Sequence, residues 1–249
     1  MAKLNGKVAV VSGASKGIGA AIAEQLAKDG AAVVVNYSNS PGQADAVVGR
    51  ITSAGGRAKA IRADLSKAVE AKQLIAATVS EFGRIDILVN NAGVYEFYPL
   101  PDVSEEHFDR IFDLNVKGLL FATQAAVNAF GDRGGTIINI SSVASLSATP
   151  STSVYSATKA AVDSFTRTLA AELGPRKVLV NSILPGPVET EGTQSIANFD
   201  TLIADFVGRT PLGRVGQPHD IARVASFLAS DEAGWITGQV IPVAGGLRG

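Results

Sequence analysis

The chain has 249 residues, with 22 lysines and arginines against 23 aspartates and glutamates, so its formal net charge at pH 7 is −1. A nearly neutral chain is a poor match for nucleic acid or an anionic membrane, and a 46% share of hydrophobic residues excludes general disorder. The chain has no cysteine and only two histidines, His107 and His219, which excludes disulfides and ordinary zinc or iron–sulfur sites. Its chemistry must therefore use oxygen nucleophiles, carboxylates, lysine or a cofactor, and we expect no metal.

The sequence also indicates where the protein works and how it is organised. Its early apolar run, Val8–Val11, is too short for a signal peptide, and no stretch approaches the roughly 18 apolar residues of a membrane span. We therefore expect a cytoplasmic protein that binds neither nucleic acid nor membrane. The length is typical of one α/β domain, here residues 1–249.

Short apolar runs alternate along the chain with stretches of helical period. The runs are rich in β-branched residues and continuously apolar, which is typical of strands buried on both faces. The alternation predicts an α/β fold in which helices cover both faces of a parallel sheet. The predicted strands are Val8–Val11, Ala32–Val35, Ala58–Ile61, Ile85–Val89, Thr136–Ile140, Val178–Ile183 and Val240–Val243. The predicted helices are Ile18–Lys28, Gln43–Ala54, Lys67–Glu81, Ser104–Phe130, Thr152–Leu173, Asn198–Gly208 and His219–Ala229.

One long segment after the sixth predicted strand has no apolar period. From Leu184 to about Ile196 the chain is rich in glycine, threonine and proline. A loop of this length in a compact domain is more often functional than idle. We predict a functional loop over about residues 184–212.

Three glycines, Gly13, Gly17 and Gly19, lie between the first predicted strand and the first predicted helix. At this place a doubly wound fold presents backbone N–H groups to a phosphate, and glycine permits the tight turn and the close approach. The spacing differs from the Gly-x-Gly-x-x-Gly dinucleotide fingerprint. A plain strand-to-helix turn remains an alternative.

Tyr155 and Lys159 lie four residues apart in a predicted helix and therefore share one face of it. An ammonium within about 4 Å of a phenol, at an effective dielectric near 20, would lower the pKa of the phenol by about three units. This pair is suited to acid–base chemistry. The alternative is a tyrosine packed on the sheet beside a lysine that extends to solvent.

Six motifs follow one another along the chain. They are Gly13-x-x-x-Gly17-x-Gly19, Asn90-Asn91-Ala92-Gly93, Leu114-Asn115-Val116, Ser142 after the fifth predicted strand, Tyr155-x-x-x-Lys159 and Pro185-Gly186. On these motifs the chain resembles the short-chain dehydrogenase/reductase family over nearly its whole length. The resemblance implies a Rossmann-like, doubly wound fold with a seven-stranded parallel sheet, a bound NAD(H) or NADP(H), and a homotetramer or homodimer, of which we expect the homotetramer.

The resemblance implies four catalytic residues. Tyr155 would pass a proton to or from the substrate oxygen, and Ser142 would hydrogen-bond that oxygen. Lys159 would lower the pKa of Tyr155 and hold the nicotinamide ribose, while Asn115 would hold a water that extends the proton relay. Donors placed in advance stabilise the alkoxide charge that develops when a carbonyl accepts hydride. Alternatively, Asn115 only caps or kinks its helix and Ser142 only ends its strand.

The resemblance also implies a set of cofactor contacts, among them Asp64 with the adenine and Thr190 with the nicotinamide carboxamide. The chain departs from the family at Ser12, where threonine is usual, and at Ala244, where aspartate is common. The implied cofactor residues are Gly13, Ser15, Lys16, Gly17, Ile18, Gly19, Asn36, Tyr37, Ser38, Asp64, Leu65, Asn91, Ala92, Gly93, Tyr155, Lys159, Pro185, Gly186, Val188 and Thr190.

The end of the second predicted strand bears on the choice between NAD and NADP. An NAD site usually offers a carboxylate to the ribose there, but residues 36–40 hold none, and the next acid is Asp45. Lys16 resembles the family's basic determinant for NADP, although a solvated side chain would also explain it. We therefore favour NADP(H) and allow NAD(H).

Tyr95, Phe97 and Tyr98 cluster after the fourth predicted strand, close to where a substrate would lie. They suggest a partly apolar pocket for a ketone of modest size, although an aromatic cluster that packs the loop down is an equal alternative. The expected substrate pocket comprises Tyr95, Ser142, Val143, Ala144, Tyr155 and Pro187, with a substrate loop over about residues 184–212.

Within the family the chain looks like 3-oxoacyl-carrier-protein reductases and glucose dehydrogenases. Ala171 stands where acyl-carrier reductases often have an arginine, so we rank a general carbonyl reductase or alcohol dehydrogenase, acting on a small carbonyl or alcohol, above them. A catalytically silent nucleotide-binding protein is a second hypothesis, and a lyase or epimerase on the same fold is a third.

Overall fold

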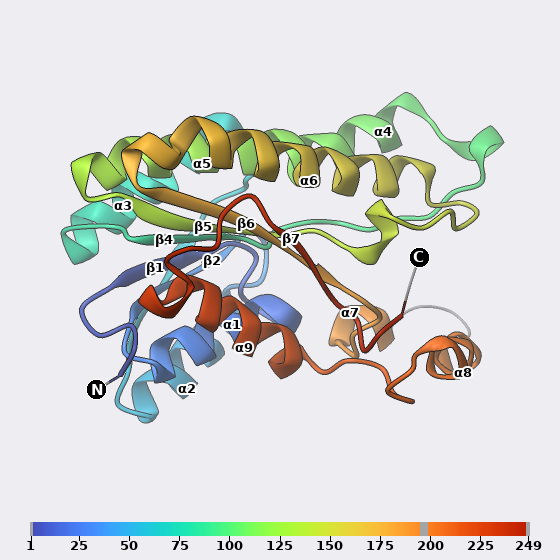
Figure 1. Ribbon diagram of the computed structural model, residues 1–249, viewed down its shortest axis with the longest axis horizontal. Helices are drawn as coiled ribbons and strands as arrows, with labels where there is room; N and C mark the ends of the chain where they lie inside the picture. Colours follow the sequence, from blue (N-terminus) through green and yellow to red (C-terminus); the bar gives the residue numbers. More distant parts are fainter. Residues whose placement is uncertain (1, 195–198, 248–249) are drawn as a thin grey trace.

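The computed structural model describes residues 2–194 and 199–247, and its elements form three layers (Figure 1). The middle layer is a seven-stranded sheet in the order β3-β2-β1-β4-β5-β6-β7, with every pair of neighbours parallel. This is the sheet that the apolar runs predicted. The strands are β1 Val8–Val11, β2 Ala32–Tyr37, β3 Arg57–Arg62, β4 Ile87–Asn90, β5 Gly135–Ile140, β6 Val178–Pro185 and β7 Val240–Val243.

Helices cover both faces of the sheet, as Figure 1 shows. One face packs against α1 (Gly17–Lys28), α2 (Pro41–Ser53) and α9 (Pro218–Ala229), and the other against α3 (Ala68–Phe82), α5 (Leu119–Phe130) and α6 (Ser153–Leu173). Alternate side chains of β2 point to opposite cores: Val33 lies in the core beneath α1, and Val34 lies in the core on the other face. Burial on both faces explains why the inner strands are mostly apolar, whereas the edge strand β3 is half exposed and contains Arg57, Lys59 and Arg62. In the described ranges, no helix combines the length and the apolar character needed to cross a bilayer.

The path of the chain through the sheet places the functional crevice. From β1 the chain moves outward to β2 and β3, then returns to the other side of β1 as β4. In a doubly wound sheet, ligands bind outside the carboxyl ends of the strands at this reversal. The glycine turn after β1 and the Asn91–Gly93 segment after β4 therefore meet at the same edge.

The helix predicted over Ser104–Phe130 is continuous from Glu105, but its middle is a π-helical turn. The segment holds α4 (Glu105–Phe112), a π-helical turn over Asp113–Gly118, and α5. The predicted start is confirmed, because Ser104 Oγ accepts a hydrogen bond from the His107 N–H at 3.1 Å. The π-helical turn holds Asn115, and single π turns occur frequently at functional sites.

The segment predicted as a loop contains regular structure. β6 continues through Leu184 to Pro185, and Glu191–Gln194 form a short helix, α7, which is too short to show an apolar period in the sequence. The next helix, α8, spans Phe199–Arg209 rather than Asn198–Gly208. Asn198, like the expected loop limit at Ile196, lies outside the described residues.

Candidate active site

The glycine turn after β1 requires glycine for packing as well as for ligand approach. Gly13 and Gly17 have φ of +59° and +58°, in the left-handed region that favours glycine. A Cβ at Gly13 would lie 2.9 Å from Ala92 Cα, and one at Gly19 would lie 2.5 Å from Asn91 Nδ2. The turn after β1 thus lies directly against the segment after β4, with the first turn of α1 at the crevice.

Ser12 links the ends of these two strands. Its hydroxyl donates to the Val89 carbonyl at 3.2 Å and accepts from the N–H groups of Asn91 and Ala92, both at 2.9 Å. The Asn91 amide donates back to the carbonyls of Ser12 and Gly13. The hydroxyl that serine shares with the usual threonine therefore has a structural role.

The end of β2 divides the expected cofactor residues into two kinds. Asn36 is buried, and its amide accepts from the Gly13 N–H and donates to the carbonyls of Ile61 and Ala63. That amide is committed to the backbone of the turn after β1 and of the end of β3. Tyr37 and Ser38 are partly exposed and can be reached by a ligand. No carboxylate stands among residues 36–40, and Lys16 is an exposed cation directly before α1.

Asp64 lies in the turn after β3. Burial raises the pKa of its carboxyl, but hydrogen bonds from the Ser66 hydroxyl and N–H and the charge of Lys67 outweigh burial and hold that pKa below its usual range. Asp64 therefore stays ionised at neutral pH. The side chain of the neighbouring Leu65 is buried in the core beneath α3.

Tyr155 and Lys159 lie in the first two turns of α6, as their spacing predicted. Lys159 is buried, its Nζ donates to the Ile140 carbonyl at 2.9 Å, and it lies 5.6 Å from the centre of the Tyr155 ring. Ser142 follows β5, and its Oγ accepts from the Ala144 N–H. These contacts bring the carboxyl end of β5 and the start of α6 together.

The π-helical turn delivers Asn115 to the same place. Its Nδ2 donates to the Val94 carbonyl at 2.9 Å and to Thr158 Oγ1 at 3.2 Å, and its Oδ1 accepts from the Val94 N–H. A Cβ at Gly93 would lie 3.1 Å from Asn115 Oδ1 and 3.7 Å from Lys159 Nζ. Glycine at 93 thus lets the chain pass close to both residues.

The expected lowering of the Tyr155 pKa by Lys159 is not found. Burial raises the pKa of Tyr155 to about 12; a hydrogen bond with Ser142 only partly opposes this, and Tyr95 adds to it. Burial also lowers the pKa of Lys159 to about 8, against the opposing charge of Asp163. The prediction failed because it considered the ammonium alone and left out the desolvation of both groups.

The aromatic residues after β4 separate into two groups. Phe97 packs edge-on against Tyr155 with ring centres 5.7 Å apart, and Tyr95 stacks on Phe97 at 6.2 Å. Tyr98 instead packs on the buried His107 of α4 at 4.6 Å. Phe97 was left out of the expected pocket, although its place between Tyr95 and Tyr98 in sequence was the available signal.

The remaining expected residues surround this centre. Val143 and Ala144 form the turn after Ser142, and Gly186 packs against Ala244, where a Cβ would lie 2.8 Å from the Ala244 Cβ. Val188 bridges to Gly216, which holds the segment that carries Pro187 and Thr190 along the crevice. Thr190 lies beside Gly17, with its Cγ2 3.4 Å from the Cβ position of that glycine.

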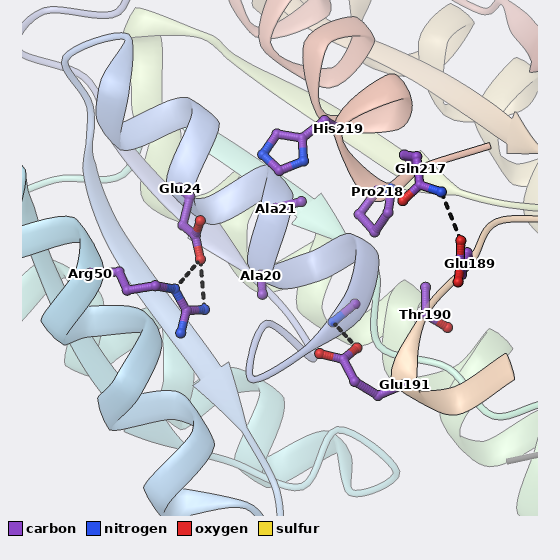
Figure 2. A pocket seen from close by; sticks show the side chains of 11 residues that line it. Ala20, Ala21, Glu24, Arg50, Glu189, Thr190, Glu191, Gln217, Pro218 and His219 are labelled. Carbon is purple, nitrogen blue, oxygen red and sulfur yellow. Dashed lines mark hydrogen bonds and ion pairs between the residues drawn. The ribbon is translucent and has the colours of Figure 1, made fainter. Parts of the chain in front are cut away.

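Glu191, at the start of α7, was not among the site residues expected from the sequence. It points toward the first turn of α1 (Figure 2), and its Oε2 accepts from the Gly17 N–H at 3.2 Å. Both residues line a cavity of about 520 Å³ between α1, α2, α9 and the segment after β6. Nothing in the sequence connects residues so far apart.

Comparisons with known proteins agree with this geometry. The family described as enoyl-(acyl carrier protein) reductase matches residues 13–248. An uncharacterized oxidoreductase of Methylorubrum extorquens is 59% identical over the whole of both chains, and versicolorin reductase 1 of Aspergillus parasiticus is 42% identical over 98% of this chain and 97% of its own. A short-chain dehydrogenase/reductase structure from Serratia marcescens superposes with a TM-score of 0.94 at 38% identity, covering 99% of this chain and 100% of its own. The chain belongs to the short-chain dehydrogenase/reductase family.

A blue fluorescent protein from a metagenomic library, solved in complex with NADPH, is also similar, with a TM-score of 0.92 at 36% identity over 99% of this chain and 100% of its own. Short-chain dehydrogenases/reductases bind a nicotinamide cofactor, and the residues present here fit one. Gly13 and Gly17, both at positive φ, place no side chain over the turn after β1, and the first turn of α1 favours an anion.

Proposed function

We propose that this chain is an NADP(H)-dependent oxidoreductase that interconverts a ketone or aldehyde with an alcohol. The observation that carries the proposal is the convergence of Asn115, Ser142, Tyr155 and Lys159 at the crevice beside the glycine turn. The bound cofactor would supply or accept the hydride. A catalytically silent relative would have no need to keep all four groups in this arrangement.

In the proposed reaction the protein supplies hydrogen bonds and one proton. Tyr155, whose raised pKa keeps its phenol protonated at neutral pH, donates its proton to the oxygen of the carbonyl as that oxygen gains charge. The Ser142 hydroxyl donates a hydrogen bond to the same oxygen. Lys159 keeps its ammonium 5.6 Å from the centre of the Tyr155 ring, where it would also hold the cofactor ribose, and Asn115 holds the backbone of Val94 nearby.

The preference for NADP(H) is supported by charge. A 2′-phosphate would meet the exposed ammonium of Lys16 and no carboxylate at residues 36–40, so nothing there repels it. The NADPH complex of a similar protein agrees with this choice. NAD(H) stays as the second cofactor to be measured.

The substrate pocket is proposed to accept a carbonyl with an apolar or aromatic substituent. Phe97 packs against Tyr155 and stacks with Tyr95, so an apolar wall stands directly beside the proton donor. We propose that residues 1–249 form one domain. Its substrate loop, over about residues 184–212, would line the side of the substrate pocket opposite Phe97. We further propose a cytoplasmic homotetramer, as is usual in the family.

The test is the initial rate of NADPH and of NADH oxidation with ketones, keto esters and an acyl-carrier thioester. With glucose, the rate of NADP⁺ and of NAD⁺ reduction is measured instead. Tyr155→Phe should lower kcat by about 100-fold or more while the Kd for NADPH stays near that of the wild type. Tyr98→Phe is the matched control, because Tyr98 packs on His107 away from Tyr155. If NADPH binds but no carbonyl compound is reduced, the protein is a silent or non-redox member of the family. Preferential use of the thioester would assign the protein to the 3-oxoacyl-carrier-protein reductases, and preferential use of glucose would assign it to the glucose dehydrogenases.

A further inference from the structure

Asp163 is a buried carboxylate that the proposed reaction does not use. It lies on α6 four residues after Lys159, so the two side chains share one face of the helix. Asp163 is 3% exposed and Lys159 is 6% exposed. A buried carboxylate and a buried ammonium are each costly to hold alone, because both lose their hydration.

The surroundings of Asp163 fit an ionised group. Ser182 of β6, itself fully buried, donates its hydroxyl to Asp163 Oδ1 at 3.2 Å. In this hydrogen bond the hydroxyl is the donor and the carboxylate is the acceptor. An ionised carboxylate can only accept hydrogen bonds. One hydrogen bond does not replace the hydration of a full charge, so an opposite charge is needed nearby.

Lys159 is the positive charge that Asp163 stabilises. In the part of the chain that the structure describes, the titratable groups facing Lys159 are Tyr155 and Asp163, both from its own helix. The elements packed against it offer only neutral groups: the Ile140 carbonyl from β5, the Gly93 backbone and the Asn115 amide. Asp163 is therefore the negative charge closest to the Lys159 ammonium on this face.

We propose that Asp163 is a positioning residue, whose buried carboxylate is the counter-charge that keeps Lys159 protonated in the active site. This inference rests on the proposed function, in which the ammonium of Lys159 is required. Burial lowers the pKa of Lys159 to about 8 even with the opposing effect of Asp163. Removing the opposing charge of Asp163 should lower this pKa further, and a fall of about one unit would leave about half of Lys159 neutral at pH 7.

The direct test is a pH titration of the protein with ¹³C-labelled lysine, followed by NMR at the Cε carbons. Lys159→Arg identifies the Lys159 resonance by its absence. In Asp163→Asn the midpoint of that resonance should fall by about one pH unit or more. Glu172→Gln, which removes an exposed carboxylate from the same helix, is the matched control and should leave the midpoint unchanged. Asp163→Glu, which keeps the carboxylate, should bring the midpoint of the Lys159 resonance most of the way back to its wild-type value.

The second measurement is the pH dependence of kcat/KM for NADPH, whose basic limb should move down by the same amount in Asp163→Asn. Asp163→Ser, which keeps a hydroxyl partner for Ser182, replaces the asparagine variant if that variant does not fold. An unchanged Lys159 midpoint in a folded variant overturns the inference. A shifted midpoint in a protein that reduces no carbonyl supports the charge pair and refutes the proposed function, so the two failures are distinguishable.

Discussion

Glu191 Oε2 accepts a hydrogen bond from the Gly17 N–H at 3.2 Å, across 174 residues of sequence. That N–H is on the first residue of α1, where unpaired N–H groups and the helix dipole attract an anion. In the proposed function the phosphates of the cofactor bind at this turn. The protein's own carboxylate therefore competes with them for the same positive end of α1.

Glu191→Gln should tighten NADPH binding. The amide oxygen can still accept from Gly17, but its charge no longer repels the phosphates, and a charge at a helix N-terminus corresponds to about a two- to fivefold change in Kd. Fluorescence titration with NADPH measures the Kd of the wild type and of the variant. Asp132→Asn is the control for net charge, because Asp132 is an exposed residue of the short helix before β5. Equal or weaker binding by Glu191→Gln would show that the carboxylate does not compete.

Ser12→Ala should destabilise the protein. The hydroxyl of this buried residue accepts from two N–H groups and donates to one carbonyl, and alanine leaves all three without it. The Val89 carbonyl and the Asn91 N–H keep backbone partners, so mainly the Ala92 N–H is left without one, and we expect the free energy of unfolding to fall by roughly 1–3 kcal/mol. Urea denaturation of the wild type, Ser12→Ala and Ser12→Thr provides the measurement. The threonine variant should stay near the wild type; a large loss there would mean that the site depends on serine's size and not on its hydroxyl.

The features that the sequence predicted well are those that local pattern controls. Strands buried on both faces are apolar throughout, so a parallel sheet covered by helices followed from the alternation of runs. Tyr155 and Lys159 share a helix face by spacing alone. Ser104 begins its helix because its hydroxyl reaches an N–H three residues on.

The features that the sequence did not predict depend on tertiary contacts. The π-helical turn places Asn115 against the backbone of Val94, which lies 21 residues earlier. The raised pKa of Tyr155 depends on burial, which no helical spacing reveals. Asn36 is a polar residue at the edge where a ligand was predicted, yet its amide binds the backbone of the turn after β1 and of the end of β3.

Gly192→Ala should alter substrate binding without altering cofactor binding. A Cβ at this position would lie 2.4 Å from Tyr95 Oη, so Tyr95 must move, and with it the ring stacked on Phe97. We expect KM for a carbonyl substrate to change by about threefold or more, while the Kd for NADPH stays within about twofold of the wild type. Steady-state kinetics and fluorescence titration separate the two effects.

A double variant provides the control for this prediction. Tyr95→Phe removes the oxygen and leaves Cζ 3.6 Å from the new Cβ, which is an ordinary contact. The pair Gly192→Ala with Tyr95→Phe should therefore behave like Tyr95→Phe alone. If the double variant keeps the full defect of Gly192→Ala, the effect does not pass through Tyr95.

The pH dependence of the reaction should be set by Lys159 and not by Tyr155. Burial lowers the pKa of Lys159 to about 8, so its ammonium predominates below that pH and is lost above it. Burial raises the pKa of Tyr155 to about 12, so its phenol stays protonated as the pH rises through the Lys159 transition. We therefore expect kcat/KM for NADPH, which reports ionisations of the free enzyme, to fall as the pH rises through about 8. The profile is measured from about pH 6 to about pH 10 at a saturating carbonyl concentration. Lys159→Arg, whose guanidinium keeps its charge, should move the fall to higher pH; a wild-type profile that stays level to about pH 10 would show that Lys159 keeps an ordinary pKa.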